Sequence, residues 1–236
     1  FMMKHENGFD VIFYTNTVLS LLLLIASLFV KVSITQKNAN SALHSQKLSL
    51  LEKFIEPKAV PISLVALLIG FAYSGVMSFL TFYAREIDLV EASSYFFLAY
   101  AFIIIFSRPY TGKLMDLRGP NIIVYPCLVI FAVGMLLFSQ ASASWMLLVA
   151  AALIGLGYGN FNSIAQTIAV KVTEPHRFGL ATSTYFILYD LGLGIGPFIL
   201  GMVEPHTTYR MIFASMIPLI LICIPLYYFL VGRKTK

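Results

Sequence analysis

Seven long apolar runs constrain the fold of this chain more than any other feature of its sequence. A helix crosses a ~30 Å hydrocarbon core with ~20 mostly apolar residues, because each residue rises ~1.5 Å. These runs are too long and too apolar for barrel strands, and an open sheet cannot cross lipid. We therefore predict an all-α membrane protein, a helical bundle with seven transmembrane helices. The runs are residues 9–30, 59–83, 93–106, 122–139, 145–170, 179–203 and 209–231.

The composition supports a membrane protein. Hydrophobic residues make up 59% of the 236 residues and charged residues only 11%, whereas a soluble domain holds roughly 25% charged residues. The third run is the shortest, and it spans the core only if Pro109 and Tyr110 extend it or if neighbouring helices cover its end. The one long connection, residues 31–58, is rich in Lys, Asn, Ser and Gln. It is either a solvated linker or an amphipathic segment on the membrane surface.

Lysine and arginine are distributed unevenly between the two sides of the predicted bundle. Thirteen of the sixteen fall on one side, and the other three are Lys4, Arg85 and Arg210. Basic loops stay in the cytoplasm. We therefore predict a multi-pass protein of the plasma membrane, with the N-terminus of this chain outside and its C-terminus in the cytoplasm. Residues 1–8 do not have the order of a signal peptide, and we expect the chain to start within a longer protein.

Asp190 lies near the middle of the sixth run, deeper than any other acidic residue in an apolar run. A carboxylate at that depth is costly and by default marks a functional site that faces a bundle interior or a water-filled path. Asp190 either binds and releases a proton or holds its helix in place by hydrogen bonding, and we favour proton coupling. The residues that follow predict close helix packing or a flexible gate. They are Gly192, Gly194, Gly196 and Pro197.

A charged segment between the third and fourth runs reads SRPYTGKLMDLRGPN over residues 107–121. We expect a tight cytoplasmic turn in which the glycines permit positive φ. Asp116 can then lie at a helix N-terminus, where its charge meets the helix dipole, and Arg118 can pair with it or with lipid headgroups. The segment resembles the G-x-L-x-D-x-x-G-R-K signature of the major facilitator superfamily. Gly112, Leu114, Asp116 and Gly119 match it, whereas Pro120 and Asn121 depart from its basic pair.

The resemblance also implies a domain organisation. The family carries this signature between helices two and three and, in a commonly more degenerate copy, between helices eight and nine. If the segment is the second copy, the seven helices are helices six to twelve, and the fold is the C-terminal six-helix half plus the preceding helix. Residues 1–31 are then helix six of the missing N-terminal half, 32–58 the cytoplasmic linker between halves, 59–232 the C-terminal bundle and 233–236 a cytoplasmic tail.

A member of this family is expected to be a secondary transporter in which two halves rock around a midplane site. The glycine-rich tenth and eleventh helices resemble drug-efflux members, which implies proton-coupled efflux of small organic molecules or drugs. The implied partners are a small-molecule substrate, protons, the lipid bilayer and the missing N-terminal half, with no cofactor or metal. An importer of small metabolites stays open, because the motif that identifies antiporters lies in helix five, outside this chain.

Polar side chains at mid-depth are the candidate substrate-binding residues. Their alternative role is hydrogen bonding between helices, worth about 0.6 kcal/mol each in membranes. The conformational motif is Gly112, Asp116, Arg118 and Gly119. The candidate substrate-binding residues are Tyr73, Ser78, Asn160, Asn162 and Gln166.

Two other classes of membrane protein fit the sequence less well. A seven-helix receptor or photosensor has the same topology, but the last run has no lysine for a retinal Schiff base, and that class leaves the charged segment unexplained. An intramembrane enzyme is disfavoured because only one deep acid is present, and no Walker loop or HExxH motif occurs. The two cysteines are isolated in apolar runs, which indicates packing rather than metal binding. The net charge of +5 lies mainly at the helix ends, so we expect no nucleic-acid partner.

Overall fold

The computed structural model describes residues 8–29 and 54–233, and within these ranges every regular element is a helix. The chain divides into two compact units, residues 1–47 and residues 48–236. The predicted all-α helical membrane protein is confirmed. Most of the predicted linker, residues 32–53, and the tail after Arg233 lie outside the described residues.

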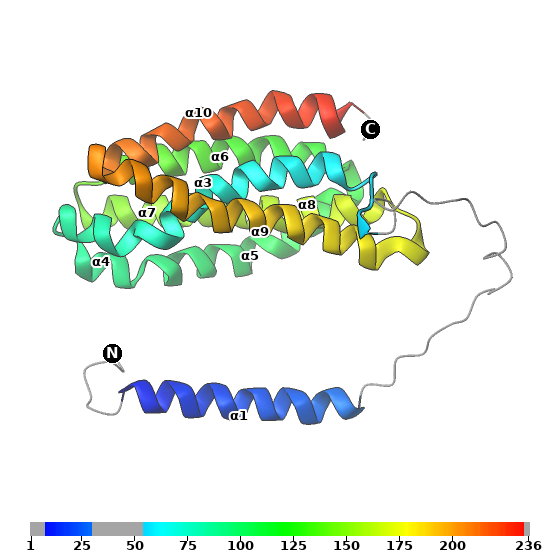
Figure 1. The fold of residues 1–236 in the computed structure, drawn as a ribbon, viewed down its shortest axis with the longest axis horizontal. Coiled ribbons are helices and arrows are strands. Elements are labelled where there is room, and N and C mark those ends of the chain that lie inside the picture. Colours follow the sequence, from blue (N-terminus) through cyan, green and yellow to red (C-terminus); the bar gives the residue numbers. More distant parts are fainter. Residues whose placement is uncertain (1–7, 30–53, 234–236) are drawn as a thin grey trace, which may run out of the picture. The chain divides into compact units, whose positions relative to one another are not determined.

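The first unit contains one helix, α1 (Gly8–Phe29), of 22 residues (Figure 1). At the usual rise, a helix of that length covers about 33 Å. Phe13–Phe29 is an apolar stretch of this helix. Its bounds lie within one residue of the first predicted run.

The second unit contains six helices that are long and apolar enough to cross a membrane. Three of them are interrupted by a short change of helix type or by a single turn. The first three are α3 (Val60–Glu86), α4 with α5 (Val90–Ser94 and Phe96–Arg118) and α6 (Asn121–Ser139). The next is α7, the π-helix η3 and α8 (Ser144–Ile154, Gly155–Gly159 and Asn160–Lys171). The last two are α9 (Phe178–Val203) and α10 with the π-helix η6 (Tyr209–Tyr227 and Tyr228–Gly232).

The third span differs from the prediction. Helix α5 continues through Pro109 and ends only at Arg118, so most of the expected loop over residues 107–120 is helical. The apolar run did not predict this extension, because the last two turns of α5 contain polar and charged residues. The turn to α6 consists of Gly119, whose φ is +80°, and Pro120. Positive φ is the conformation that glycine adopts at least cost.

Helix α3 is at the centre of the second unit and packs most extensively against α9 (Figure 1). It also contacts α10, which packs on α6. Helix α7 completes the bundle through its contacts with α6 and α5. This arrangement places one face of α3 against α9.

Aromatic side chains tie four helices together near one end of this bundle. The Tyr83 hydroxyl of α3 donates a 2.8 Å hydrogen bond to the carbonyl oxygen of Phe138 in α6. The Phe138 ring lies 4.6 Å from that of Phe213 in α10 and 5.5 Å from that of Phe96 in α5. All four side chains are fully buried. Such ring pairs contribute about 0.5–1.5 kcal/mol beyond their buried area, so this cluster fixes the positions of all four helices.

Candidate functional site

Five tyrosines from four membrane-length helices gather inside the second unit, and we call them the tyrosine cluster. The rings of Tyr73 and Tyr158 are stacked, with centroids 3.8 Å apart, and the Tyr100 ring lies 6.0 Å from that of Tyr73. The hydroxyls of Tyr158 and Tyr189 share a hydrogen bond. Tyr185 stacks on Tyr189 with 5.9 Å between centroids. The cluster therefore links α3, α5, η3 and α9 through rings and hydroxyls.

The π-helix η3 positions Tyr158 in this cluster. Its sequence is GLGYG; Gly155 and Gly157 lie against neighbouring backbone, and Gly159 lies against the Ile104 side chain. A methyl group at Gly155 would lie 2.7 Å from the Tyr100 carbonyl oxygen, and one at Gly157 would lie 2.6 Å from that of Cys127. Any larger residue would push α5 and α6 away. Single π-turns inside α-helices frequently occur at functional sites.

Asn162, a predicted substrate-binding residue, joins the end of the cluster. Its side-chain oxygen accepts a 2.6 Å hydrogen bond from the Tyr185 hydroxyl. Gln166 lies one turn further along α8, on the same side as Asn162, and both are half-buried. The structure therefore brings Tyr73 and Asn162 into one connected set of side chains.

Asn160 is part of a different contact. Its side-chain nitrogen donates to Ser107 Oγ and to the Leu156 carbonyl oxygen, both at 2.8 Å, and its oxygen accepts from Thr111 Oγ1 at 3.0 Å. The side chain is buried and turned toward α5. These contacts are the interhelical hydrogen bonds that were the alternative to substrate binding for Asn160.

The structure does not bring Ser78 to the tyrosine cluster. Ser78 is exposed on α3, whereas the buried Ser74 donates to the Phe71 carbonyl oxygen at 2.7 Å and lies against Gly196 of α9. Ser74 is therefore packed against α9, whereas Ser78, one turn further along α3, is exposed.

Asp190 is exposed on the surface of the second unit. It lies near the midpoint of α9, between the exposed residues Ile187 and Leu191. No hydrogen bond or ion pair to its carboxylate occurs among residues 54–233. Its sequence neighbour Tyr189 points into the bundle, so the carboxylate and the cluster occupy adjacent sides of one helix.

The glycines of α9 also divide between two sides. A methyl group at Gly192 would clash with the Leu67 carbonyl oxygen of α3, and one at Gly196 would clash with Ser74. A methyl group at Gly194 would meet nothing within 4 Å. Pro197 lies inside α9, which continues past it to Val203.

The conformational motif lies at the end of α5 rather than at a helix N-terminus. The prediction for the position of Asp116 was wrong, because α5 continues two residues beyond it. The carboxylate Oδ1 pairs with Lys171 Nζ at 2.9 Å, at the end of α8. Gly112 lies within α5 and has open space around it, and Arg118 is exposed in the last turn.

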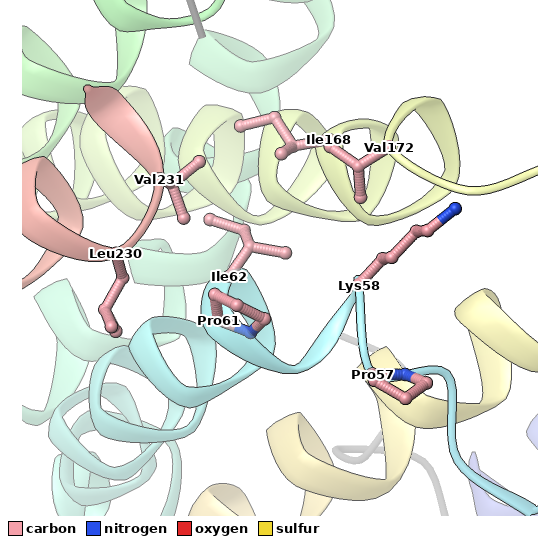
Figure 2. A pocket seen from close by; sticks show the side chains of 8 residues that line it. All are labelled: Pro57, Lys58, Pro61, Ile62, Ile168, Val172, Leu230 and Val231. Atoms are coloured by element: carbon pink, nitrogen blue, oxygen red, sulfur yellow. The ribbon is translucent and has the colours of Figure 1, made fainter. Parts of the chain in front are cut away.

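A hollow of about 360 Å³ lies where α3 begins, beside the end of α8 (Figure 2). Its walls are apolar except for Lys58, whose side chain extends away from Ile62 and past Val172. The ammonium group lies 3.3 Å from Glu174 Oε1. No member of the tyrosine cluster lines this hollow. The lining residues are Pro57, Lys58, Pro61, Ile62, Ile168, Val172, Leu230 and Val231.

Four members of the tyrosine cluster were not predicted from the sequence. Two patterns in the sequence could have indicated three of these residues. Tyr158 lies within three alternating glycines, and Tyr185 and Tyr189 share a helix face immediately before Asp190. Tyr100 gives no comparable signal, because its run contains several other aromatic residues.

Six membrane-length helices packed in one bundle define a multi-pass membrane protein. The family model of the Major Facilitator Superfamily matches residues 1–126 and 93–236, which together cover the chain and share residues 93–126. The chain therefore belongs to the Major Facilitator Superfamily, and the predicted resemblance is confirmed. The shared range contains all four residues of the conformational motif.

Curated relatives are similar over most of this chain. The Multidrug resistance protein MdtG of Salmonella typhi is 28% identical over 173 residues, which are 71% of this chain and 43% of the relative. The proteins of the same name from Salmonella newport (strain SL254) and Salmonella agona (strain SL483) have the same identity and coverage. The match thus spans less than half the length of these relatives.

Proposed function

We propose that this chain is the C-terminal part of a secondary transporter that exports small organic molecules in exchange for protons by alternating access. Membership of the Major Facilitator Superfamily and similarity to multidrug resistance proteins support the class of function. In such transporters two repeats rock against each other around a site near the bilayer midplane. The second unit then corresponds to one repeat, and the chain carrying the other repeat would complete the site.

The exposed carboxylate of Asp190 is the observation that carries this proposal. An aspartate at the centre of a spanning helix costs about 2.5–3.5 kcal/mol in insertion experiments, and such residues face protein or water rather than lipid. Asp190 nevertheless lies on the outside of the second unit. The side of α9 that bears it is therefore expected to face the other repeat or a water-filled path. That position suits a group that takes up a proton from one side and releases it to the other.

The tyrosine cluster supports small organic molecules as substrates. Aromatic faces stack on planar ligands, and phenolic hydroxyls donate and accept hydrogen bonds. Tyr100 is half-buried while the other four are buried, so its ring is the part of the cluster nearest to open space. Asn162 adds an amide group that is bonded to Tyr185, and Gln166 adds another one turn further along the same side of α8. This set of groups fits a ligand that combines an aromatic body with a few polar atoms.

The charged residues support the proposed orientation. Ion pairs join Lys58 to Glu174 and Lys171 to Asp116, so these residues share one end of the bundle. Arg210 donates to the Ala141 carbonyl oxygen at 2.8 Å at the other end. Basic residues that stay on the cytoplasmic side would place the first end in the cytoplasm.

Transport by the full-length protein in proteoliposomes tests the proposal. With an imposed pH gradient, the wild type should move a fluorescent organic cation, and Asp190→Asn should lower the initial rate at least tenfold with unchanged protein yield. Asp88→Asn is the matched control, because Asp88 lies in a turn with φ of 56°, a conformation that asparagine also tolerates. An unchanged pH-driven rate in Asp190→Asn would refute proton coupling at this residue. Gradient-driven movement in the opposite direction would favour an importer.

A further inference from the structure

We propose that Arg108 is a specificity-determining residue of the transport site, where its guanidinium binds an oxyanion group of the substrate, in the simplest case a carboxylate. The molecules transported then include aromatic compounds with an anionic group as well as purely cationic ones. The inference rests on the proposed transport function. It concerns a basic residue that lies outside the tyrosine cluster and outside the conformational motif.

The structure places Arg108 deep within a spanning helix. Its sequence predicted a loop beyond the third apolar run, but α5 continues well past it. Its neighbours Ser107 and Thr111 make hydrogen bonds of 2.8 Å and 3.0 Å with Asn160. Asn160 lies about 4 Å from the middle of the span Ser144–Lys171, at ~1.5 Å per residue. Arg108 is therefore close to mid-depth.

A basic residue at that depth requires a partner or water. Intramembrane arginines face a bundle interior or a water-filled cavity, and they mark the paths of substrates and ions. Arg108 is exposed on α5, and no hydrogen bond or ion pair among residues 54–233 involves its guanidinium. The next acid along α5 is Asp116, which pairs with Lys171 at 2.9 Å. The described part of the second unit therefore supplies no ion-pair partner for Arg108.

Arg108 lies on the side of α5 that bears Tyr100. Residues four apart are neighbours on a helix surface, so Tyr100, Ile104 and Arg108 form one row. The guanidinium is close enough to the Tyr100 hydroxyl for an electrostatic interaction between them. One turn beyond Arg108, a methyl group at Gly112 would meet nothing within 4 Å. This row therefore leads from the half-buried member of the tyrosine cluster to an open, positively charged position.

Another side of α5 is suited to lipid. An apolar groove of about 420 Å³ lies there, and its walls include Leu98 and Phe102 of α5 and Leu148 of α7. Phe102 precedes Arg108 by six residues, which turns the two side chains about 120° apart. Because a charged group is costly against lipid tails, the Arg108 side of α5 is the one that faces the transport path.

The guanidinium and the neighbouring rings are complementary to an aromatic anion. The planar guanidinium stays protonated and donates two parallel hydrogen bonds to a carboxylate or phosphate group. The ring of Tyr100 offers an aromatic face in the adjoining row. Asp190 adjoins a different member of the cluster, Tyr189, on α9. A substrate whose ring lies on the cluster can thus direct an anionic group to Arg108 and keep it away from the carboxylate of Asp190.

The first experiment compares two dyes in proteoliposomes that contain the full-length protein. One is a rhodamine with a free carboxylate, and the other is its methyl ester, a fluorescent organic cation with the same aromatic body. The wild type should transport both. Arg108→Gln should raise KM for the carboxylate dye at least tenfold and leave KM for the ester within twofold. Lys113→Gln is the matched control, because Lys113 is exposed on the same helix but about 140° away, and it should stay within twofold for both dyes.

Three results would overturn the proposal. They are an equal change in KM for the two dyes in Arg108→Gln, a wild-type KM for the carboxylate dye in that variant, and a wild type that transports only the ester. A lower kcat for both dyes with unchanged KM would also overturn it, and would mean that Arg108 pairs with an acid of the other repeat. A wild type that transports neither dye would instead refute the proposed function, and this inference with it.

The second experiment needs no substitution and keeps the proposal testable if Arg108→Gln fails to fold. Binding of the carboxylate dye to the purified full-length protein in detergent is followed by fluorescence anisotropy while a competitor is added. Benzoate and benzamide have nearly the same shape, but only benzoate is an anion. Benzoate should displace the dye at a concentration at least tenfold lower than benzamide does. Equal displacement by the two competitors would overturn the proposal.

Discussion

The substitution of alanine for Gly192 tests most directly how α9 packs on α3. Gly192→Ala adds one carbon that would clash with the Leu67 carbonyl oxygen. A backbone atom cannot rotate away as a side chain can, so the two helices must separate. Gly194→Ala is the matched control, because it adds the same carbon to the same helix where nothing lies within 4 Å.

The two substitutions should shift stability in opposite directions. Alanine in place of glycine favours a helix by about 1 kcal/mol. Overpacking costs about 1–3 kcal/mol, and the upper end applies at Gly192 because the contact is with backbone. The expected net effects are a loss of about 2 kcal/mol for Gly192→Ala and a gain of up to about 1 kcal/mol for Gly194→Ala. The gap is therefore about 3 kcal/mol.

Thermal unfolding of the purified protein in detergent measures this gap. For a chain of this size, about 1 kcal/mol corresponds to about 2–4 °C in Tm, so the two variants should differ by about 6–12 °C, with Gly192→Ala the lower. Equal Tm values for the two variants would refute the close approach of α9 to α3. A lower Tm for Gly194→Ala would show that the open side of α9 is in fact covered in the intact protein.

Two further substitutions test the conformational motif and the tyrosine cluster. Asp116→Asn breaks a pair whose side chains are 68% and 57% exposed, so the free energy of unfolding should change by less than about 1 kcal/mol. If the motif acts in the cycle, kcat for transport should fall with KM unchanged, and normal turnover would count against that role. Tyr158→Phe removes the hydrogen bond to Tyr189 and keeps the ring stack, so unfolding should become easier by about 0.5–1.5 kcal/mol. A Tm equal to that of the wild type would mean that this hydrogen bond contributes nothing.

The apolar runs were sufficient to predict the fold class and the bounds of most helices. Hydropathy is a strong guide in membranes because the bilayer requires long apolar helices whose backbone groups are all paired. The same reasoning failed at the end of α5, where the helix leaves the apolar run and continues to Arg118. Residue composition alone cannot separate a polar helical turn from a polar loop.

The tyrosine cluster could be predicted only in part, because it depends on how four helices cross. Tyr73 was a candidate, but its stacking partner Tyr158 is positioned by a π-helix. That distortion arises from close contacts between glycines and neighbouring helices, which a single sequence does not reveal. Asn160 illustrates the opposite case. Its polar side chain at mid-depth makes hydrogen bonds to its own helix and α5. The i, i+4 spacing places Asn162 and Gln166 on one side of the helix and Asn160 on another, but it does not tell which side meets a neighbouring helix.

The two sides of α9 explain how a proton and a substrate could be coupled without touching. Tyr189 is held inside the bundle by Tyr158, while Asp190, the next residue, lies on the exposed side. Successive residues on a helix are about 100° apart, so the carboxylate is directed away from the cluster. A change in its charge would act on whatever covers α9 and also, over a longer distance, on the neighbouring Tyr185 and Tyr189. Protonation of Asp190 would then reach the substrate through a movement of α9. Because α9 packs on α3, which carries Tyr73, the packing of these two helices decides whether that movement reaches the tyrosine cluster.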